Sequence, residues 1–187
     1  MTEARSFLQE INEAILHGSP ESRARALWHA TDLLIAGRYT EDQIWVFGEV
    51  IGRLADEIEV AARAQLSKRL APSDNAPVKV VKKLAFDDSI DVAGPVLRQS
   101  ERLDTRTLVA NAKSKSQQHL LAISERRTIS EEVTDVLATR GDREVARSVA
   151  KRRGNPAFGA VLTVPYNESE ALGRICIRRK RSAQKRL

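Results

Sequence analysis

The stretch YTEDQIWVFGEVIGRL at residues 39–54 carries the clearest helical signal in the chain. Thr40 is placed to cap the amide of Gln43, and the Gln43 side chain can reach back to the Thr40 amide, which is a capping box. Tyr39 and Ile44 occupy the two positions of a hydrophobic staple. Behind this start, apolar residues recur at steps of three and four, which predicts one buried helix face made of Ile44, Phe47, Ile51 and Leu54.

Similar signals on both sides of this stretch predict a succession of short helices. Ser19-Pro20 has the order of a cap followed by a first helical residue, and Gly37 predicts the end of that helix. Further starts are predicted at Pro77, Leu103-Asp104, Ile129-Ser130 and Gly141-Asp142. No strand-turn-strand pattern interrupts the series. Helices of about 10–15 residues are marginal alone in water, so each of them must be held by its neighbours.

A weak internal repeat accompanies these helices. Four segments share a polar residue, an aliphatic residue and then small residues, and the aliphatic positions are Val60, Val92, Leu120 and Val145. A drifting period of about 25–40 residues with two helices per unit is typical of an α-solenoid. The expected fold is therefore all-α, a HEAT/ARM-like α-solenoid of short antiparallel helix pairs. The alternative is an irregular helical bundle whose alanine-rich helices look alike.

Six runs of the sequence together resemble a bacterial family, the domain of unknown function 2336 family. They lie at 53–63, 66–71, 77–85, 88–100, 121–130 and 141–146. The likeness covers most of residues 20–156 and is most specific around 84–100, whereas the basic ending at 178–181 departs from the family's usual continuation. The resemblance implies HEAT-like helical repeats and a source among the alphaproteobacteria, and it implies no reaction.

Three parts are expected along the chain. Residues 1–37 are predicted to be a helical pair that acts as a cap or a dimerisation element, which makes a homodimer a partner hypothesis. Residues 38–156 are predicted to hold the HEAT-like repeats. Residues 157–187 are predicted to form a divergent basic helix or tail. An open helical array leaves apolar end faces, and these need a polar cap or a second subunit.

Composition excludes several classes of protein. Of the 187 residues, 42% are hydrophobic, which is too many for a wholly disordered chain. No stretch approaches 18 consecutive apolar residues, so no membrane span is expected. The single cysteine, Cys176, rules out an intrachain disulfide framework. The beginning of the sequence lacks the pattern of a signal peptide, and a bacterial cytoplasmic protein is expected.

Positive charge gathers toward the end of the sequence. Residues 140–187 hold 13 basic and 4 acidic side chains, a net charge of +9, whereas residues 1–139 hold 18 basic and 21 acidic, a net charge of −3. Such asymmetry suits an anionic partner, although a solvated tail is the plainer interpretation. The candidate residues for binding an anionic partner are Arg140, Arg143, Arg147, Lys151, Arg152, Arg153, Arg174, Arg178, Arg179, Lys180 and Arg181.

No catalytic motif is present in the sequence. The HExxH, GxSxG, P-loop and GxGxxG patterns are all missing. The histidines His17, His29 and His119 are isolated from other ligand types and are expected to be structural. Asp87 and its acidic neighbours lack the glycine and glutamate of a calcium loop. No catalytic residue, cofactor or metal is therefore expected.

The two tryptophans offer a further candidate surface. Exposed tryptophans are frequent anchors of protein interfaces. Trp28 and Trp45 lie among apolar residues, so burial in the core is expected for both.

The leading functional hypothesis is a non-enzymatic scaffold or adaptor that mediates protein–protein interaction, since an array of helices offers a long surface for distributed contacts. The alternative is nucleic-acid binding through the basic segment at the end of the sequence. A DNA glycosylase of the HEAT-like type is the least expected function, because its chemistry needs an acidic residue and aromatic side chains around a basic groove.

Overall fold

The computed structural model describes residues 17–151, which form helices and contain no strand. The predicted all-α class is therefore confirmed for this part of the chain. The first elements are α2 (Pro20–Ala36), α3 (Glu41–Asp56), α4 (Val60–Leu70) and α5 (Val78–Ala85). They are followed by α6 (Ile90–Gln99), α7 (Thr105–Ser114), α8 (Gln117–Ser124), α9 (Glu131–Arg140) and α10 (Arg143–Ala150). Of the three predicted parts, residues 1–16 of the part at 1–37, residues 152–156 of the part at 38–156 and the whole part at 157–187 lie outside the described residues.

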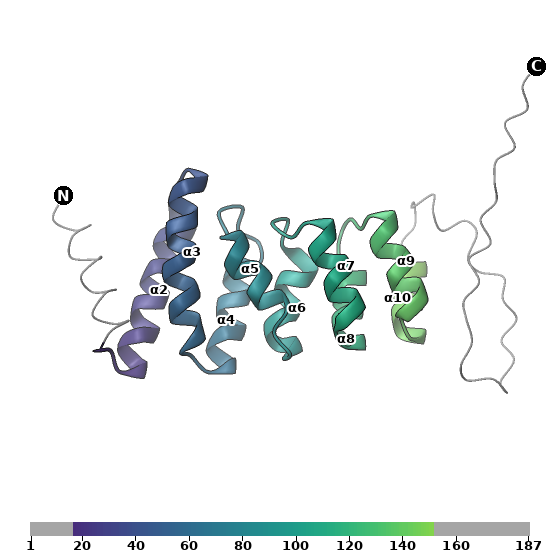
Figure 1. The fold of residues 1–187 in the computed structure, drawn as a ribbon, viewed down its shortest axis with the longest axis horizontal. Coiled ribbons are helices and arrows are strands. Elements are labelled where there is room, and N and C mark those ends of the chain that lie inside the picture. The colour runs from purple at the N-terminus through teal and green to yellow at the C-terminus, as the bar shows by residue number, and fades with distance from the viewer. Residues whose placement is uncertain (1–16, 152–187) are drawn as a thin grey trace, which may run out of the picture.

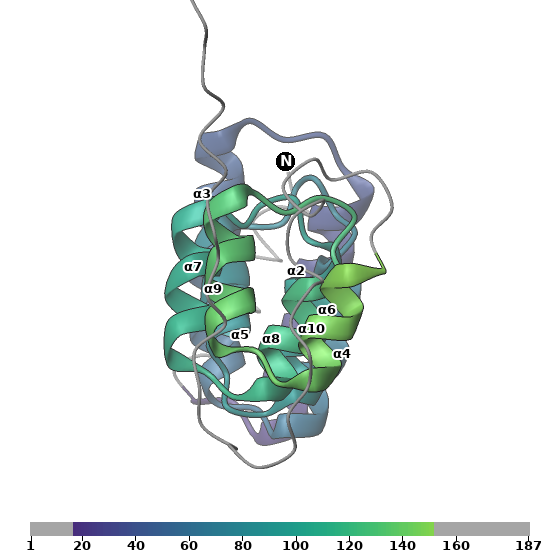
Figure 2. The ribbon, with the colours of Figure 1, turned by 90° about the vertical axis from the view of Figure 1, so that its right-hand side faces the viewer.

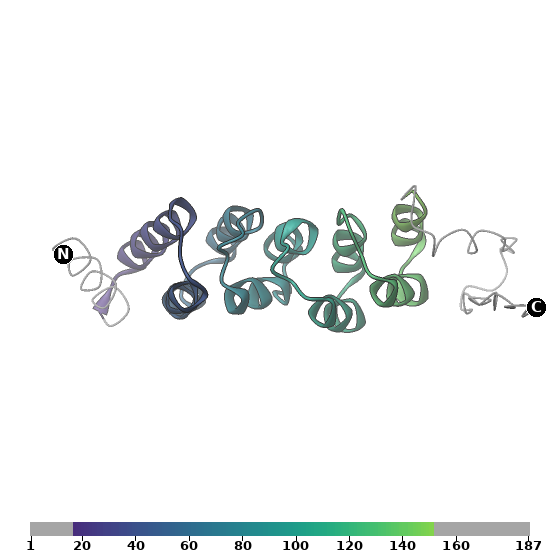
Figure 3. The same ribbon diagram turned by 90° about the horizontal axis from the view of Figure 1, so that it is seen from above.

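The helices stand side by side along one long axis (Figure 1) and divide into two rows when seen from above (Figure 3). Helices α4, α6, α8 and α10 pack on one another in that order, and α2 lies beside α4. In the other row, α3 packs against α5 and α7 packs against α9. The end-on view separates the same two rows (Figure 2). Each helix thus packs mainly against helices one or two places away in the sequence.

Most helices begin where the sequence predicts. Side-chain oxygens accept hydrogen bonds from amides of the first turn at five starts, and these caps are Ser19, Thr40, Asp104, Ser130 and Asp142. The capping box of Thr40 and Gln43 is complete. Gly141 follows the last residue of α9 with an extended backbone, and a Cβ there would collide with the Leu137 carbonyl oxygen. Close packing of the backbone therefore favours glycine at this helix end.

The hydrophobic core runs between and within the two rows. Its largest fully buried side chains are Leu27, Leu34, Ile51, Leu54, Leu66, Leu70, Leu97, Leu120, Ile123 and Leu137. Burial of one such side chain stabilises a fold by about 1.5–3 kcal/mol. This contribution holds helices that are too short to persist alone. The predicted face of α3 is buried at Ile44, Ile51 and Leu54, and half-buried Phe47 packs against it.

The four positions of the internal repeat fall on α4, α6, α8 and α10, which are the successive helices of one row. Val92, Leu120 and Val145 are buried as the repeat predicts. Val60 differs, because its side chain is 46% exposed. Val60 is the first residue of α4, whereas the other three lie on the third or fourth residue of their helices. In α4, the position that the sequence repeat marks is therefore not a buried position of the helix.

Polar side chains tie the ends of the helices together across the array. Arg126 donates hydrogen bonds to the carbonyls of Leu97 and Ser100, and Asn111 donates to the carbonyl of Ala85. Asn75, Arg102 and Arg140 make similar bonds to carbonyls at least 26 residues earlier. The last carbonyls of a helix lack partners within that helix. These side chains supply several of the missing partners and join five segments of the chain to earlier ones.

Candidate interaction surfaces

Three of the predicted basic residues share one face of α10. Arg143, Arg147 and Lys151 follow one another at steps of four residues and are all exposed. Residues spaced four apart lie on the same side of a helix. Within residues 17–151 none of the three side chains forms an ion pair. The structure therefore places three basic side chains on one face of α10 and its C-cap, none of them in an ion pair within residues 17–151.

Arg140, unlike the three basic residues of α10, forms a structural contact between helices. Its guanidinium donates a hydrogen bond to the Ala112 carbonyl at the end of α7. The Gln117 side chain joins the same region, because it donates to the Arg140 carbonyl and accepts from the Asp142 amide. Arg140 thus holds helix ends together. The other predicted basic residues lie outside the described part of the chain, and they are Arg152, Arg153, Arg174, Arg178, Arg179, Lys180 and Arg181.

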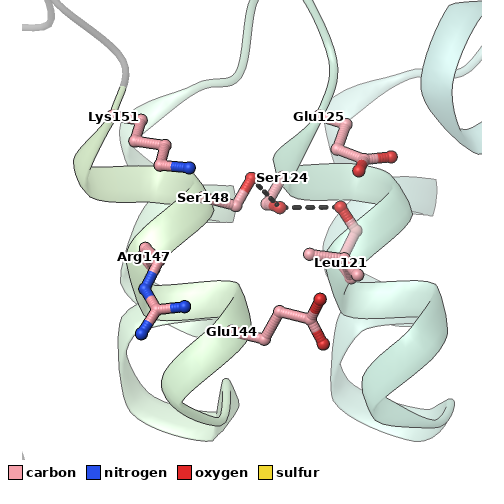
Figure 4. A pocket seen from close by; sticks show the side chains of 7 residues that line it. All are labelled: Leu121, Ser124, Glu125, Glu144, Arg147, Ser148 and Lys151. Atoms are coloured by element: carbon pink, nitrogen blue, oxygen red, sulfur yellow. Dashed lines mark hydrogen bonds between the residues drawn. The ribbon is translucent and has the colours of Figure 1, made fainter.

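A groove of about 480 Å³ lies between α8 and α10 (Figure 4). The hydroxyls of Ser124 and Ser148 are 2.7 Å apart within it, and the Ser124 hydroxyl donates to the Leu121 carbonyl at 2.6 Å. Charged side chains of both signs line the remainder, and these are Glu125, Glu144, Arg147 and Lys151. Sequence reasoning identified the two basic residues only. The repeat could have revealed the rest, because it places α8 and α10 in successive units.

A second groove, of about 320 Å³, lies between α3 and the start of α5. Trp45 lines it with a side chain that is 63% exposed, so the prediction that Trp45 is buried is wrong. The reason is helical geometry: Ile44 faces the core, and the next residue is turned by about 100° away from it. Apolar sequence neighbours therefore did not indicate burial for Trp45.

Arg102 and Glu41 form one wall of this second groove. The two guanidinium nitrogens Nη1 and Nη2 lie 3.0 and 2.7 Å from the two carboxylate oxygens of Glu41, a bidentate pair. These hydrogen bonds lower the pKa of Glu41 and raise the pKa of Arg102. Arg102 also donates to the Ala76 carbonyl. The pair therefore connects α3 with the segments before α5 and α7.

Trp28, on α2, packs against the core and is half-buried. The Arg69 guanidinium lies 5.1 Å from the centre of its ring, and Arg69 also pairs with Asp32 at 2.6 Å. A cation at this distance from an indole face is attracted by the ring quadrupole. The predicted burial of Trp28 is thus met in part, with an arginine covering the ring.

The histidines and aspartates singled out in the sequence have separate surroundings. His119 is buried, with Nε2 3.0 Å from the Asp87 carbonyl and Nδ1 2.8 Å from the Ser116 hydroxyl. The carbonyl can only accept, so Nε2 carries the proton of that bond. The Asp87 carboxylate accepts from Arg63, and Asp88 pairs with Lys115 at 2.5 Å, which lowers the pKa of Asp88. In the described ranges, no three potential metal ligands converge.

No helix between residues 17 and 151 has both the length and the apolar character that crossing a membrane demands.

Comparison with known proteins adds one match. Neither a curated protein nor a solved structure matches the chain. Residues 92–156, a segment that contains most of α6 and all of α7 to α10, match the model of a family described as "Uncharacterised protein conserved in bacteria" (DUF2336), which confirms the resemblance seen in the sequence.

Proposed function

We propose that this chain is a HEAT-like α-solenoid that acts as a scaffold or adaptor for a protein partner. Two rows of helices, each packed against its sequence neighbours, support the solenoid proposal. The groove between α8 and α10 is the observation that carries the functional proposal (Figure 4). It runs between successive helices of one row, and exposed charged groups line it together with the half-buried Ser148 hydroxyl.

The mixture of charges in this groove favours a polypeptide partner. Glu125 and Glu144 line it together with Arg147 and Lys151. Opposed patches of both signs give specificity toward a partner of complementary pattern. A polypeptide can present both signs, whereas a nucleic-acid backbone presents negative charge only. The Glu144 carboxylate would repel phosphates that approached the groove, whereas Glu125 is paired with Arg98 at 2.5 Å.

Site-specific photocrosslinking tests this proposal. A photoreactive amino acid is placed in the full chain at Leu121 or Arg147 in the groove, or at exposed Glu132 on α9 as a control. Irradiation in extract of the source organism is expected to give the same discrete protein adduct from both groove positions and not from Glu132. The proposal fails if the groove positions give no adduct, or if all three positions give the same mixture.

Nucleic-acid binding is the second candidate function, because α10 presents Arg143, Arg147 and Lys151 without ion pairs in the described chain. Fluorescence anisotropy with labelled duplex and single-stranded DNA at about 50 and 200 mM salt measures it. Binding by this face is expected to weaken steeply with salt and to weaken further in Lys151→Glu. Lys113→Glu on α7 changes the net charge equally and is the matched control. Absence of binding at about 50 mM salt would remove this candidate.

A further inference from the structure

Within the fold, the guanidinium of Arg69 is bound by an aromatic ring and a carboxylate. Trp28 and Asp32 lie four residues apart on α2, so they share a face of that helix. Arg69 of α4 stacks on the Trp28 ring and pairs with the Asp32 carboxylate. An indole face and a carboxylate one helical turn apart thus contact the same guanidinium in this molecule.

Helix α3 presents the same two chemical groups on its outer surface. Asp42 and Trp45 lie three residues apart, a spacing that also places them on one face, and both line the groove beside α5. Asp42 is exposed and forms no ion pair among residues 17–151. No cation from the same range stacks on Trp45. Arg102, the nearby guanidinium in this groove, is held by the bidentate pair with Glu41.

We propose that Asp42 and Trp45 form a receptor for an arginine side chain of an extended basic peptide, which rests on the proposed scaffold function and specifies its partner. A guanidinium is planar, so it can stack on an indole ring and direct two donors to a carboxylate. Val78, which is half-buried in the lining of the groove, offers an apolar contact for the methylene stem of the arginine.

Two cations also line the groove, but Lys79 pairs with Glu49 and Arg102 pairs with Glu41. Asp42 is thus the acidic group of this lining that has no ion pair within residues 17–151, and its charge favours a cationic peptide.

Intrinsic fluorescence of Trp45 tests the receptor. The chain has two tryptophans, so Trp28→Phe leaves Trp45 as the single reporter and keeps an aromatic face beneath Arg69. The probe is the peptide acetyl-Ala-Arg-Ala-Arg-Ala-amide, compared with the same peptide containing citrulline, which is nearly isosteric and uncharged. The arginine peptide is expected to change the emission saturably, with the citrulline peptide about tenfold weaker.

Substitutions then assign the binding to this pair of residues. Asp42→Asn is expected to weaken the arginine peptide about threefold, whereas Asp135→Asn, at an exposed position on α9, is expected to leave it unchanged. Circular dichroism checks that each variant is folded. The indole N–H signals in nuclear magnetic resonance spectra of the unaltered protein check that the Trp28→Phe change has not created the binding. The receptor proposal is overturned if citrulline binds equally, if both Asn variants bind alike, or if no change occurs up to about 5 mM peptide.

This result can be separated from the test of the scaffold function. Crosslinking at Leu121 and Arg147 samples the groove between α8 and α10, in the other row of helices. A negative titration with a positive crosslink refutes the arginine receptor alone. A positive titration with a negative crosslink keeps the receptor and removes the groove beside α10 as a protein-binding site.

Discussion

Arg126 offers the sharpest test of how successive helices are coupled. It follows α8, and only 4% of its surface is exposed. Its Nη1 and Nη2 each donate a hydrogen bond of 2.8 Å, one to the Leu97 carbonyl and one to the Ser100 carbonyl. These carbonyls belong to the last turn and the C-cap of α6, where acceptors lack partners within the helix. We predict that Arg126→Ala strongly destabilises the fold.

The magnitude follows from the two carbonyls. Leu97 and Ser100 are both fully buried, so water cannot readily replace the lost donors. A buried polar group left without a partner costs about 1–3 kcal/mol. With two such groups, the expected loss in the free energy of unfolding is about 3 kcal/mol. This is a large part of the 5–15 kcal/mol that is typical of folded proteins, so the effect is easily measured.

Urea unfolding followed by circular dichroism measures this loss. Arg127→Ala is the matched control, because Arg127 is adjacent and exposed and the two variants lose the same charge. Surface substitutions of this kind change stability by about 0.5 kcal/mol or less. Arg126→Met separates hydrogen bonding from packing, since it restores an apolar stem without donors and is expected to remain destabilised. Equal stability of the two alanine variants would refute the coupling described for Arg126.

Two further predictions concern α3 and the start of α7. Gly52→Ala is expected to stabilise the protein by about 1 kcal/mol through helix propensity, whereas Gly48→Ala forfeits that gain because its Cβ would lie 2.9 Å from the Pro77 Cβ. Equal thermal midpoints of the two variants would contradict this close packing. Hydrogen bonding from Thr107 holds the pKa of Asp104 far below its usual value of 3.8. The stabilisation that the ionised Asp104 side chain gives to the fold is therefore present above about pH 4 and is lost as the pH falls. Asp104→Ala should therefore cost about 1 kcal/mol in urea unfolding at pH 7 and less at about pH 3, and a pH-independent difference would contradict this account.

Helix starts could be predicted from the sequence because the chemistry of a cap is local. Thr40 and Gln43 are three residues apart, and their reciprocal hydrogen bonds need nothing beyond the first turn. The same holds for Asp142, which accepts from amides two and three residues later. Such interactions can be read from spacing alone. The order of the helices and the all-α class followed from them.

Burial and side-chain partners could not be predicted in the same way. Whether Trp45 is buried depends on which side of α3 the neighbouring helices cover, and its apolar sequence neighbours do not give that direction. Arg140 and Arg147 look alike in the sequence, yet one bonds a carbonyl 28 residues earlier and the other lines a groove. Contacts over such separations are set by the packing of whole helices. The candidate site was therefore predicted only as a set of basic residues.

The pattern of internal bonding also indicates where a partner can bind. Several carbonyls in the last turns of helices already accept hydrogen bonds from side chains elsewhere in the chain, among them those of Ala85, Leu97 and Ala112. A partner that competed for these carbonyls would have to break the contacts that join the helices. Two groove side chains differ from these, because those of Trp45 and Arg147 form no hydrogen bond or ion pair within residues 17–151 and can change neighbours without breaking one. Binding through groove side chains therefore leaves the array intact, which is the property that a scaffold requires.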